Sequence, residues 1–173
     1  MIFTGIKRKS NQLFFNKRLQ ELINNSNDIP IRDVKKVIIF VDEFSVKSNI
    51  KNYLIKQLKI SEDNIDVVFF QQKMSKNNDL NNVFSPKDFG WYGKVNSIEL
   101  KNILTKKYDL LINYSKVENI YSNLLILQCK ANLKVGFASL DNRLYELLIN
   151  CKINEIDLFN TELKKYLEIL KRI

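Results

Sequence analysis

The stretch VKKVIIFVDEFSVKSNIKNYLIKQLKISEDNIDVVFF, residues 34–70, decides the fold. Its first eight residues are a mostly apolar, β-branched run of strand length, and IDVVFF at residues 65–70 is a second run of this kind. Between them, residues 46–58 repeat apolar side chains at the helical spacing of three and four residues. A strand, a helix and a strand in this order predict a parallel β-α-β unit.

The same alternation continues to the end of the chain. We predict helices at residues 98–106, 120–130 and 155–172, and strands at residues 109–114 and 133–137. Residues 144–150 fit either a strand or a helix, and we expect a fifth strand there. Residues 71–94 follow neither period and are predicted to form a long irregular loop. Near-continuous apolar strands are typical of a parallel sheet that is covered on both faces. Residues 31–173 are therefore predicted to be one three-layer, Rossmann-like α/β domain with a mostly parallel sheet of four to five strands.

Residues 6–24 predict a further helix, within an N-terminal unit of residues 1–30 that precedes the α/β domain. On a wheel of 100° per residue, one side of this helix gathers the apolar residues Phe15, Leu19, Leu22 and Ile23. The basic residues Lys7, Lys17 and Arg18 fall on the other side. The pattern predicts an amphipathic helix with a basic outer face.

The positive charge is concentrated in two segments. The 173 residues include 28 Lys and Arg, 19 Asp and Glu and no histidine, for a net charge of +9. Residues 1–36 hold eight basic and three acidic residues, residues 73–107 hold seven lysines and three acidic residues, and the remainder is balanced. Such a concentration is typical of a surface that faces a polyanion. We expect the partner to be RNA, with a ribosome-associated RNA as the leading candidate.

The composition excludes several kinds of catalytic site. Without histidine, the chain has no Ser-His-Asp triad and no His-ligated metal. Its four glycines form none of the standard phosphate-binding loops. We therefore expect a non-catalytic protein without cofactor or metal. Cys129 and Cys151 lack a CxxC spacing and predict two buried, reduced thiols, with a disulfide or a metal pair as the alternative. The absence of a signal-peptide pattern or a long apolar run predicts a cytoplasmic protein that does not enter a membrane.

Residues 85–94, SPKDFGWYGK, are the most unusual string in the chain. They contain two of the four glycines and the single tryptophan, flanked by lysines. Aromatic rings interleaved with lysines can stack on bases while the ammonium groups meet phosphates; burial of Phe89 and Trp91 in the core is the alternative. The predicted RNA contacts are Lys7, Arg8, Lys9, Lys17, Arg18, Lys87, Trp91, Tyr92 and Lys94.

Two other functions are compatible with the sequence. In a parallel sheet, ligands bind outside the carboxyl ends of the strands, where the polar candidates are Asp42, Glu43, Asn113, Ser139 and Asp141. They would serve a Rossmann-like enzyme or a nucleotide-binding protein. The third possibility is an adaptor that docks another protein through helix 6–24, with Phe14 and Phe15 as contacts.

Five strings taken in order resemble a known family: DEF after the first strand, SPKDFGWYGK, YDLLINY, ANLKVGF and FNTELKKYLEIL. They are similar to an uncharacterised family of about this length from Bacteroidota, a domain of unknown function. The similarity covers essentially the whole chain, and the SPKDFGW-type segment is its most specific mark. The resemblance implies a cytoplasmic bacterial protein and brings no activity with it.

Overall fold

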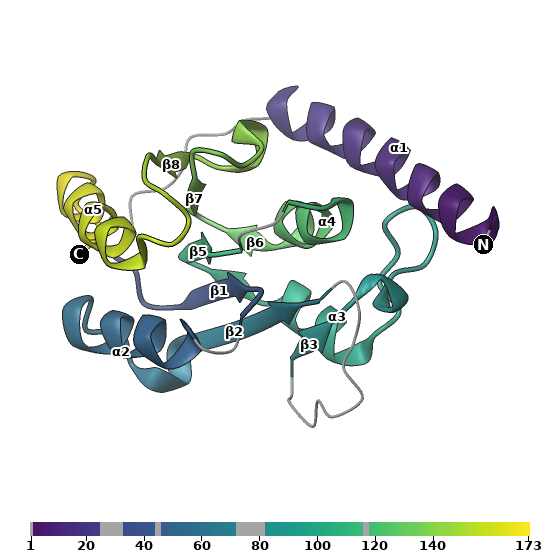
Figure 1. Ribbon diagram of the computed structural model, residues 1–173. Coiled ribbons are helices and arrows are strands. Elements are labelled where there is room, and N and C mark those ends of the chain that lie inside the picture. Colours follow the sequence, from purple (N-terminus) through teal and green to yellow (C-terminus); the bar gives the residue numbers. More distant parts are fainter. Residues whose placement is uncertain (1, 25–32, 44–45, 72–81, 116–117) are drawn as a thin grey trace.

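The fold is a doubly wound α/β sheet (Figure 1), seen in a computed structural model that describes residues 2–24, 33–43, 46–71, 82–115 and 118–173. Six strands form one parallel sheet in the order β3-β2-β1-β5-β7-β8. Their bounds are β1 Val37–Val41, β2 Ile65–Phe70, β3 Val83–Phe84, β5 Leu110–Asn113, β7 Lys134–Phe137 and β8 Leu147–Ile149. The α/β class and the parallel sheet are thus confirmed.

The sheet has one strand more than the upper number predicted from the sequence. The additional strand is β3, which pairs with β2 through Phe69–Val83 and Phe70–Phe84. It lies within the segment predicted to be irregular, because two residues are too few for an alternating pattern to be recognised. A separate two-stranded parallel sheet joins β4 (Lys107–Tyr108) to β6 (Lys130–Ala131).

Counted along the chain, the main sheet has the order 3-2-1-4-5-6. The chain therefore extends the sheet in one direction from β1 and in the opposite direction from β5, and the reversal falls between these two neighbouring strands. Such a reversal opens a crevice at the carboxyl ends of the strands, where ligands bind in doubly wound proteins.

Helices cover both faces of the sheet. On one face, α2 (Lys47–Gln57) and α5 (Ile156–Ile169) are joined by a 2.6 Å hydrogen bond that Tyr53 Oη donates to the carbonyl of Asn160. The helices α3 (Ile98–Thr105) and α4 (Ile120–Gln128) lie on the other face (Figure 1). Among the described residues, no helix is both long enough and apolar enough to cross a membrane.

The N-terminal helix α1 (Ile2–Asn24) adds a layer outside α4 (Figure 1). As a result, every residue of α4 from Ile120 to Leu127 is buried, since one side meets the sheet and the other meets α1. A helix enclosed in this way is apolar on all sides, which is why the string IYSNLLIL shows little amphipathic contrast. The layers over this face of the sheet are α4 and then α1.

The side of α1 that faces the domain differs from the predicted one. Phe15 and Leu19 are buried as predicted, but Leu22 is 43% exposed, so its predicted burial is wrong. The side chain of Ile23 lies outside the described residues. The polar residues Ser10 and Asn11, which were not predicted to face the domain, are buried. The contact side of α1 is rotated because a second element, formed by residues 85–96, also packs against it.

Both cysteines are free thiols. Cys129 is buried, and this burial raises the pKa of its thiol to about 12. A thiol with such a pKa stays protonated at neutral pH, and the protonated form is a poor nucleophile. Cys151 is half-buried, and desolvation also raises its pKa.

Candidate functional site

We call residues 85–96 the hairpin: a short 3-10 helix, Pro86–Asp88, leads into a tight antiparallel turn in which Phe89 pairs with Val95. Its turn is closed by a 3.1 Å hydrogen bond that the Lys94 N–H donates to the carbonyl of Trp91. The two residues between them, Tyr92 and Gly93, have φ angles of 52° and 70°. Two consecutive positive φ values at the centre of a turn are the mark of type I′, the turn that suits the twist of a hairpin.

The aromatic residues of the hairpin are divided between core and solvent. Phe89 is fully buried, and its ring centroid lies 5.3 Å from that of Tyr121 on α4. Trp91 and Tyr92, at the tip, are 43% and 65% exposed. The alternative prediction was that Phe89 and Trp91 are buried in the core. It is confirmed for Phe89 and wrong for Trp91. Phe89 anchors the hairpin, and the two tip residues face the solvent.

Asn11 fastens the hairpin to α1. Its side chain is fully buried, and its amide Nδ2 donates to the carbonyl of Gly90 at 3.0 Å while its Oδ1 accepts from the Gly93 N–H at 2.7 Å. One helix residue earlier, the Ser10 hydroxyl accepts from the Tyr92 N–H at 3.3 Å. These contacts supply hydrogen-bond partners for backbone groups of the hairpin, and the bond to the Gly93 N–H is buried.

Two further contacts fix the same junction. A Cβ atom at Gly93 would lie 2.4 Å from the ring of Phe14, and the φ of this residue is positive, so only glycine fits there. The Lys7 ammonium donates to the carbonyl of Pro86 at 3.1 Å. From α4, the Gln128 amide donates to the Gly93 carbonyl at 3.1 Å. The hairpin is thus held by both α1 and α4.

This packing joins the two basic segments, whose contacting residues lie 79 to 82 positions apart in the chain. We call residues 2–20 of α1 together with residues 85–96 the α1–hairpin surface. Residues 2–20 contain no acidic residue, and the hairpin contains only Asp88. The carboxylate of Asp88 accepts hydrogen bonds from the N–H and the hydroxyl of Ser85. The exposed basic side chains are those of Arg8, Lys9, Lys17, Arg18, Lys87 and Lys94.

Two of the predicted RNA contacts have partners within the chain. Lys7 is half-buried and holds the hairpin through Pro86, so its role in the structure is to join the two elements. The Arg18 guanidinium lies 2.7 Å from the Glu21 carboxylate, in an exposed ion pair of the kind that contributes little to stability. Trp91 and Tyr92 lie at the tip of the hairpin with their side chains exposed.

An exposed apolar stripe on α1 was not predicted from the sequence. Phe3, Ile6 and Leu13 are 79%, 48% and 67% exposed. On the helical wheel they fall within about 80° of one another, together with Ser10, which contacts the hairpin. Their positions on the helical wheel could have revealed the stripe, because they lie away from the side that Phe15 and Leu19 share. The α1–hairpin surface is therefore both basic and apolar.

Of the five strand-end candidates, Asn113 and Asp141 make contacts with neighbouring side chains. Asn113 is buried, accepting from the Ser115 N–H at 3.0 Å and donating to the Tyr145 hydroxyl at 2.7 Å. Asp141 pairs with Arg143 at 2.6 Å, and the hydrogen bonds from Arg143 hold the pKa of this carboxyl below its usual value. Ser139 is exposed after β7, and Asp42 and Glu43 follow β1, the first half-buried and the second exposed.

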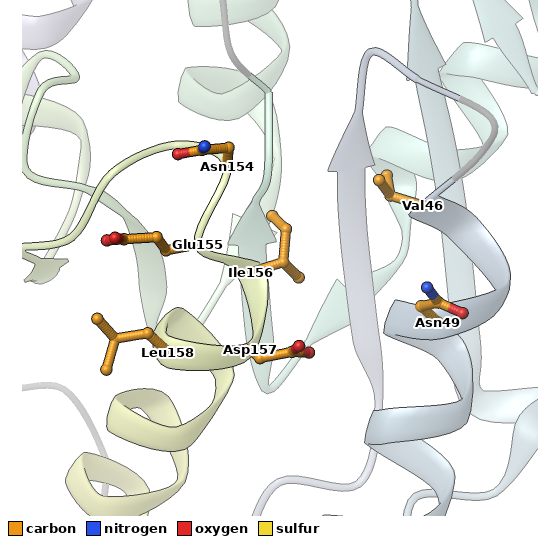
Figure 2. A pocket seen from close by; sticks show the side chains of 7 residues that line it. All are labelled: Val46, Asn49, Asn154, Glu155, Ile156, Asp157 and Leu158. Atoms are coloured by element: carbon orange, nitrogen blue, oxygen red, sulfur yellow. The ribbon is translucent and has the colours of Figure 1, made fainter.

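A pocket of about 360 Å³ lies instead between the first turns of α2 and α5 (Figure 2). Both helices begin at the carboxyl edge of the sheet, on the face that they share. Figure 2 shows Asn49 of α2 and Asp157 of α5 directed toward each other across the gap. The lining residues are Val46, Asn49, Asn154, Glu155, Ile156, Asp157 and Leu158. None is a predicted strand-end candidate, because the pocket is formed by helix starts rather than by strand ends.

Within the described parts of the chain, no group of three or more acidic or cysteine side chains could hold a metal ion. Comparison with curated proteins and with solved structures gives no match. A family model described as a family of unknown function, DUF6913, matches residues 7–170. The match includes the whole hairpin and α1 from Lys7 onward. The chain therefore belongs to DUF6913, a family of unknown function.

Proposed function

We propose that this protein binds RNA without catalysis, through the α1–hairpin surface. The observation that supports the proposal is the junction made by Asn11 and Ser10, which unites two basic segments that are distant in sequence. A row of lysines on one helix can be an ordinary solvated face. Two such segments are brought together here: Asp88 is the only acidic residue within residues 2–20 and 85–96, and Glu21, just beyond them, is paired with Arg18. This excess of basic residues favours a polyanionic partner.

The expected binding is electrostatic and only weakly sequence-specific. Exposed lysines meet phosphate oxygens as point charges, and each contact releases a condensed counterion. Phosphate contacts position a nucleic acid and carry little sequence information. The affinity should therefore fall steeply as salt rises. Lys9, Lys17 and Lys94 are suitable probes because their side chains are exposed and none of them joins the hairpin to α1.

Reversing these three charges, in the variant Lys9→Glu, Lys17→Glu, Lys94→Glu, is expected to weaken RNA binding about 10- to 100-fold at low salt and to reduce the salt slope by about 2. The measurement is fluorescence anisotropy with a labelled RNA at low and at moderate salt. A matched control makes the same change of charge at three exposed lysines elsewhere: Lys56 on α2, Lys152 in the segment before α5, and Lys165 on α5. The proposal would be contradicted if the two variants bind RNA equally tightly, or if the RNA affinity does not change with salt concentration.

The RNA that we propose first is ribosomal. Sedimentation of a cell lysate on a sucrose gradient at low and high salt tests it directly. Comigration with ribosomal subunits that is lost as salt rises would support a ribosomal contact. Migration at the top of the gradient in both salts would exclude the ribosome and leave other RNAs as candidates.

A small-molecule site in the pocket between α2 and α5 is the second candidate. Two observations favour it: the strand order reverses between β1 and β5, and a pocket of about 360 Å³ opens at the same edge of the sheet. Ligands of doubly wound proteins bind at such a reversal, and 300–1,000 Å³ is the usual range for ligand pockets.

For this candidate we expect a nucleoside, nucleotide or sugar nucleotide to raise the melting temperature. A ligand at 100 times its Kd contributes about 2.7 kcal/mol. At about 2–4 °C per kcal/mol for a chain of this size, this corresponds to a shift of about 5–11 °C. The double variant Asn49→Ala, Asp157→Ala should lose the shift, whereas Ser48→Ala, at an exposed neighbouring position, should keep it. If none of the nucleosides, nucleotides and sugar nucleotides tested raises the melting temperature, this candidate function is rejected.

A further inference from the structure

We propose that the α1–hairpin surface selects single-stranded RNA over duplex RNA, and that bases of the single strand stack on Trp91 and Tyr92. This inference rests on the proposed function and deepens it. Charge alone cannot make the distinction, because both forms of RNA present phosphates. The selection comes from the two adjacent aromatic side chains at the tip of the hairpin.

The exposure of these two side chains is the first observation. Trp91 is 43% exposed and Tyr92 is 65% exposed. Large aromatic side chains usually lie largely inside a protein, so two consecutive exposed ones are unusual. In single-stranded RNA, unstacked bases are free to stack on aromatic rings. In an A-form duplex the bases are stacked on one another, and a protein reaches mainly phosphates and 2′-hydroxyls.

The second observation is the conformation that presents the rings. Tyr92 has a φ of 52°, in the left-handed region, at a turn position where Asn or Gly is favoured. The turn would therefore be more stable with glycine at residue 92. Ser10 and Asn11 hold the N–H groups of Tyr92 and Gly93 and so keep the turn in this geometry. A tip fixed in this way loses little conformational entropy when a base stacks on it.

The third observation is the charge and apolar surface around the tip. Lys94 is exposed next to the turn, and Lys17 lies on the same side of the α1 wheel as Ser10, the residue that contacts Tyr92. Phosphates on either side of a stacked base would find ammonium groups there. The apolar stripe of Phe3, Ile6 and Leu13 adds a third ring and two aliphatic side chains as contacts for further bases. Ser10 and Lys17 interrupt this stripe, unlike the continuous apolar face of a helix that lies in a bilayer.

The test uses the intrinsic fluorescence of Trp91, the single tryptophan of the chain. An unstructured 12-nucleotide RNA and the duplex of the same length are titrated into the protein at low salt. We expect the single strand to bind at least five-fold more tightly and to quench the fluorescence, and the duplex to bind without quenching. Equal binding of both RNAs without quenching would overturn this inference and leave RNA binding intact. If neither RNA binds, both this inference and the proposed RNA binding are overturned. A blue shift of the Trp91 fluorescence that anionic lipid vesicles cause and RNA does not would also overturn both.

Variants at residue 92 separate stacking from folding. Tyr92→Gly removes the ring and also the unfavourable φ, so it is expected to fold at least as stably as the parent chain. It should nevertheless lose about five-fold or more in affinity for the single strand, with no change in affinity for the duplex by anisotropy. Tyr92→Phe keeps the ring and should retain the parent affinity. A stable Tyr92→Gly variant with unchanged single-strand affinity would show that the ring does not contact bases.

Discussion

Asn11→Ala is expected to lower the free energy of unfolding by about 3 kcal/mol. The buried side chain bonds the Gly90 carbonyl and the Gly93 N–H, and alanine leaves both groups without that partner. A buried polar group that loses its hydrogen bond costs about 1–3 kcal/mol. Urea denaturation followed by circular dichroism gives the change directly.

Asn16→Ala is the matched control, since Asn16 is exposed on the same helix and its side chain only accepts a hydrogen bond from Gln12. It should change the stability by less than about 0.5 kcal/mol. Asn11→Ala should also weaken RNA binding, because the hairpin would no longer be fixed beside α1. If the two variants are equally stable, Asn11 does not hold the junction, and the two basic segments are independent.

Phe159→Ala is expected to destabilise the protein by about 3–5 kcal/mol, the usual cost of removing a large aromatic residue from a core. Phe159 is a fully buried residue of α5. Its ring centroid lies 4.5 Å from that of Phe137 and 5.1 Å from that of Tyr114. Alanine would leave a cavity between α5 and the sheet. The aromatic contacts contribute beyond the buried area. Thermal and urea denaturation both report the loss.

The neighbouring substitution Leu158→Ala provides the control, because Leu158 is 46% exposed at the rim of the pocket between α2 and α5. It should change the stability by less than about 1 kcal/mol. RNA binding by folded Phe159→Ala protein should stay near the parent value, since α5 lies on the face of the sheet opposite to α4 and α1. Similar losses for the two variants would mean that α5 is only loosely packed.

Most elements of the fold could be predicted from local sequence. The run that became β2 was predicted with the correct bounds, and most of the helices and strands differ from their predicted ends by one to three residues. Such apolar runs bury their own side chains, so their period is visible without knowledge of the neighbours. The two-residue strand β3 and the short β4–β6 pair could not be found in this way, because their pairing is created by the surrounding fold.

Only part of the candidate site could be predicted from the sequence. The basic residues and the unusual SPKDFGWYGK segment were visible as composition, and Tyr92 and Trp91 were identified as aromatic residues among lysines. Leu22 was predicted to be buried and is exposed, while Phe3, Ile6 and Leu13 were not recognised as a surface stripe. The pocket between α2 and α5 was missed, because its residues belong to two helices that are separated by about half of the chain.

By itself, the sequence determined an α/β fold with a parallel sheet, the positive charge of two segments and the lack of histidine chemistry. Only the tertiary structure decided that the two segments share one surface. The residues that join them, Ser10 and Asn11, are polar, and a polar residue carries no hydrophobic signal of burial. Their partners are backbone groups of a hairpin 79 to 82 residues away. Local periodicity reports which side of an element is buried, but which element covers that side depends on packing over the whole chain.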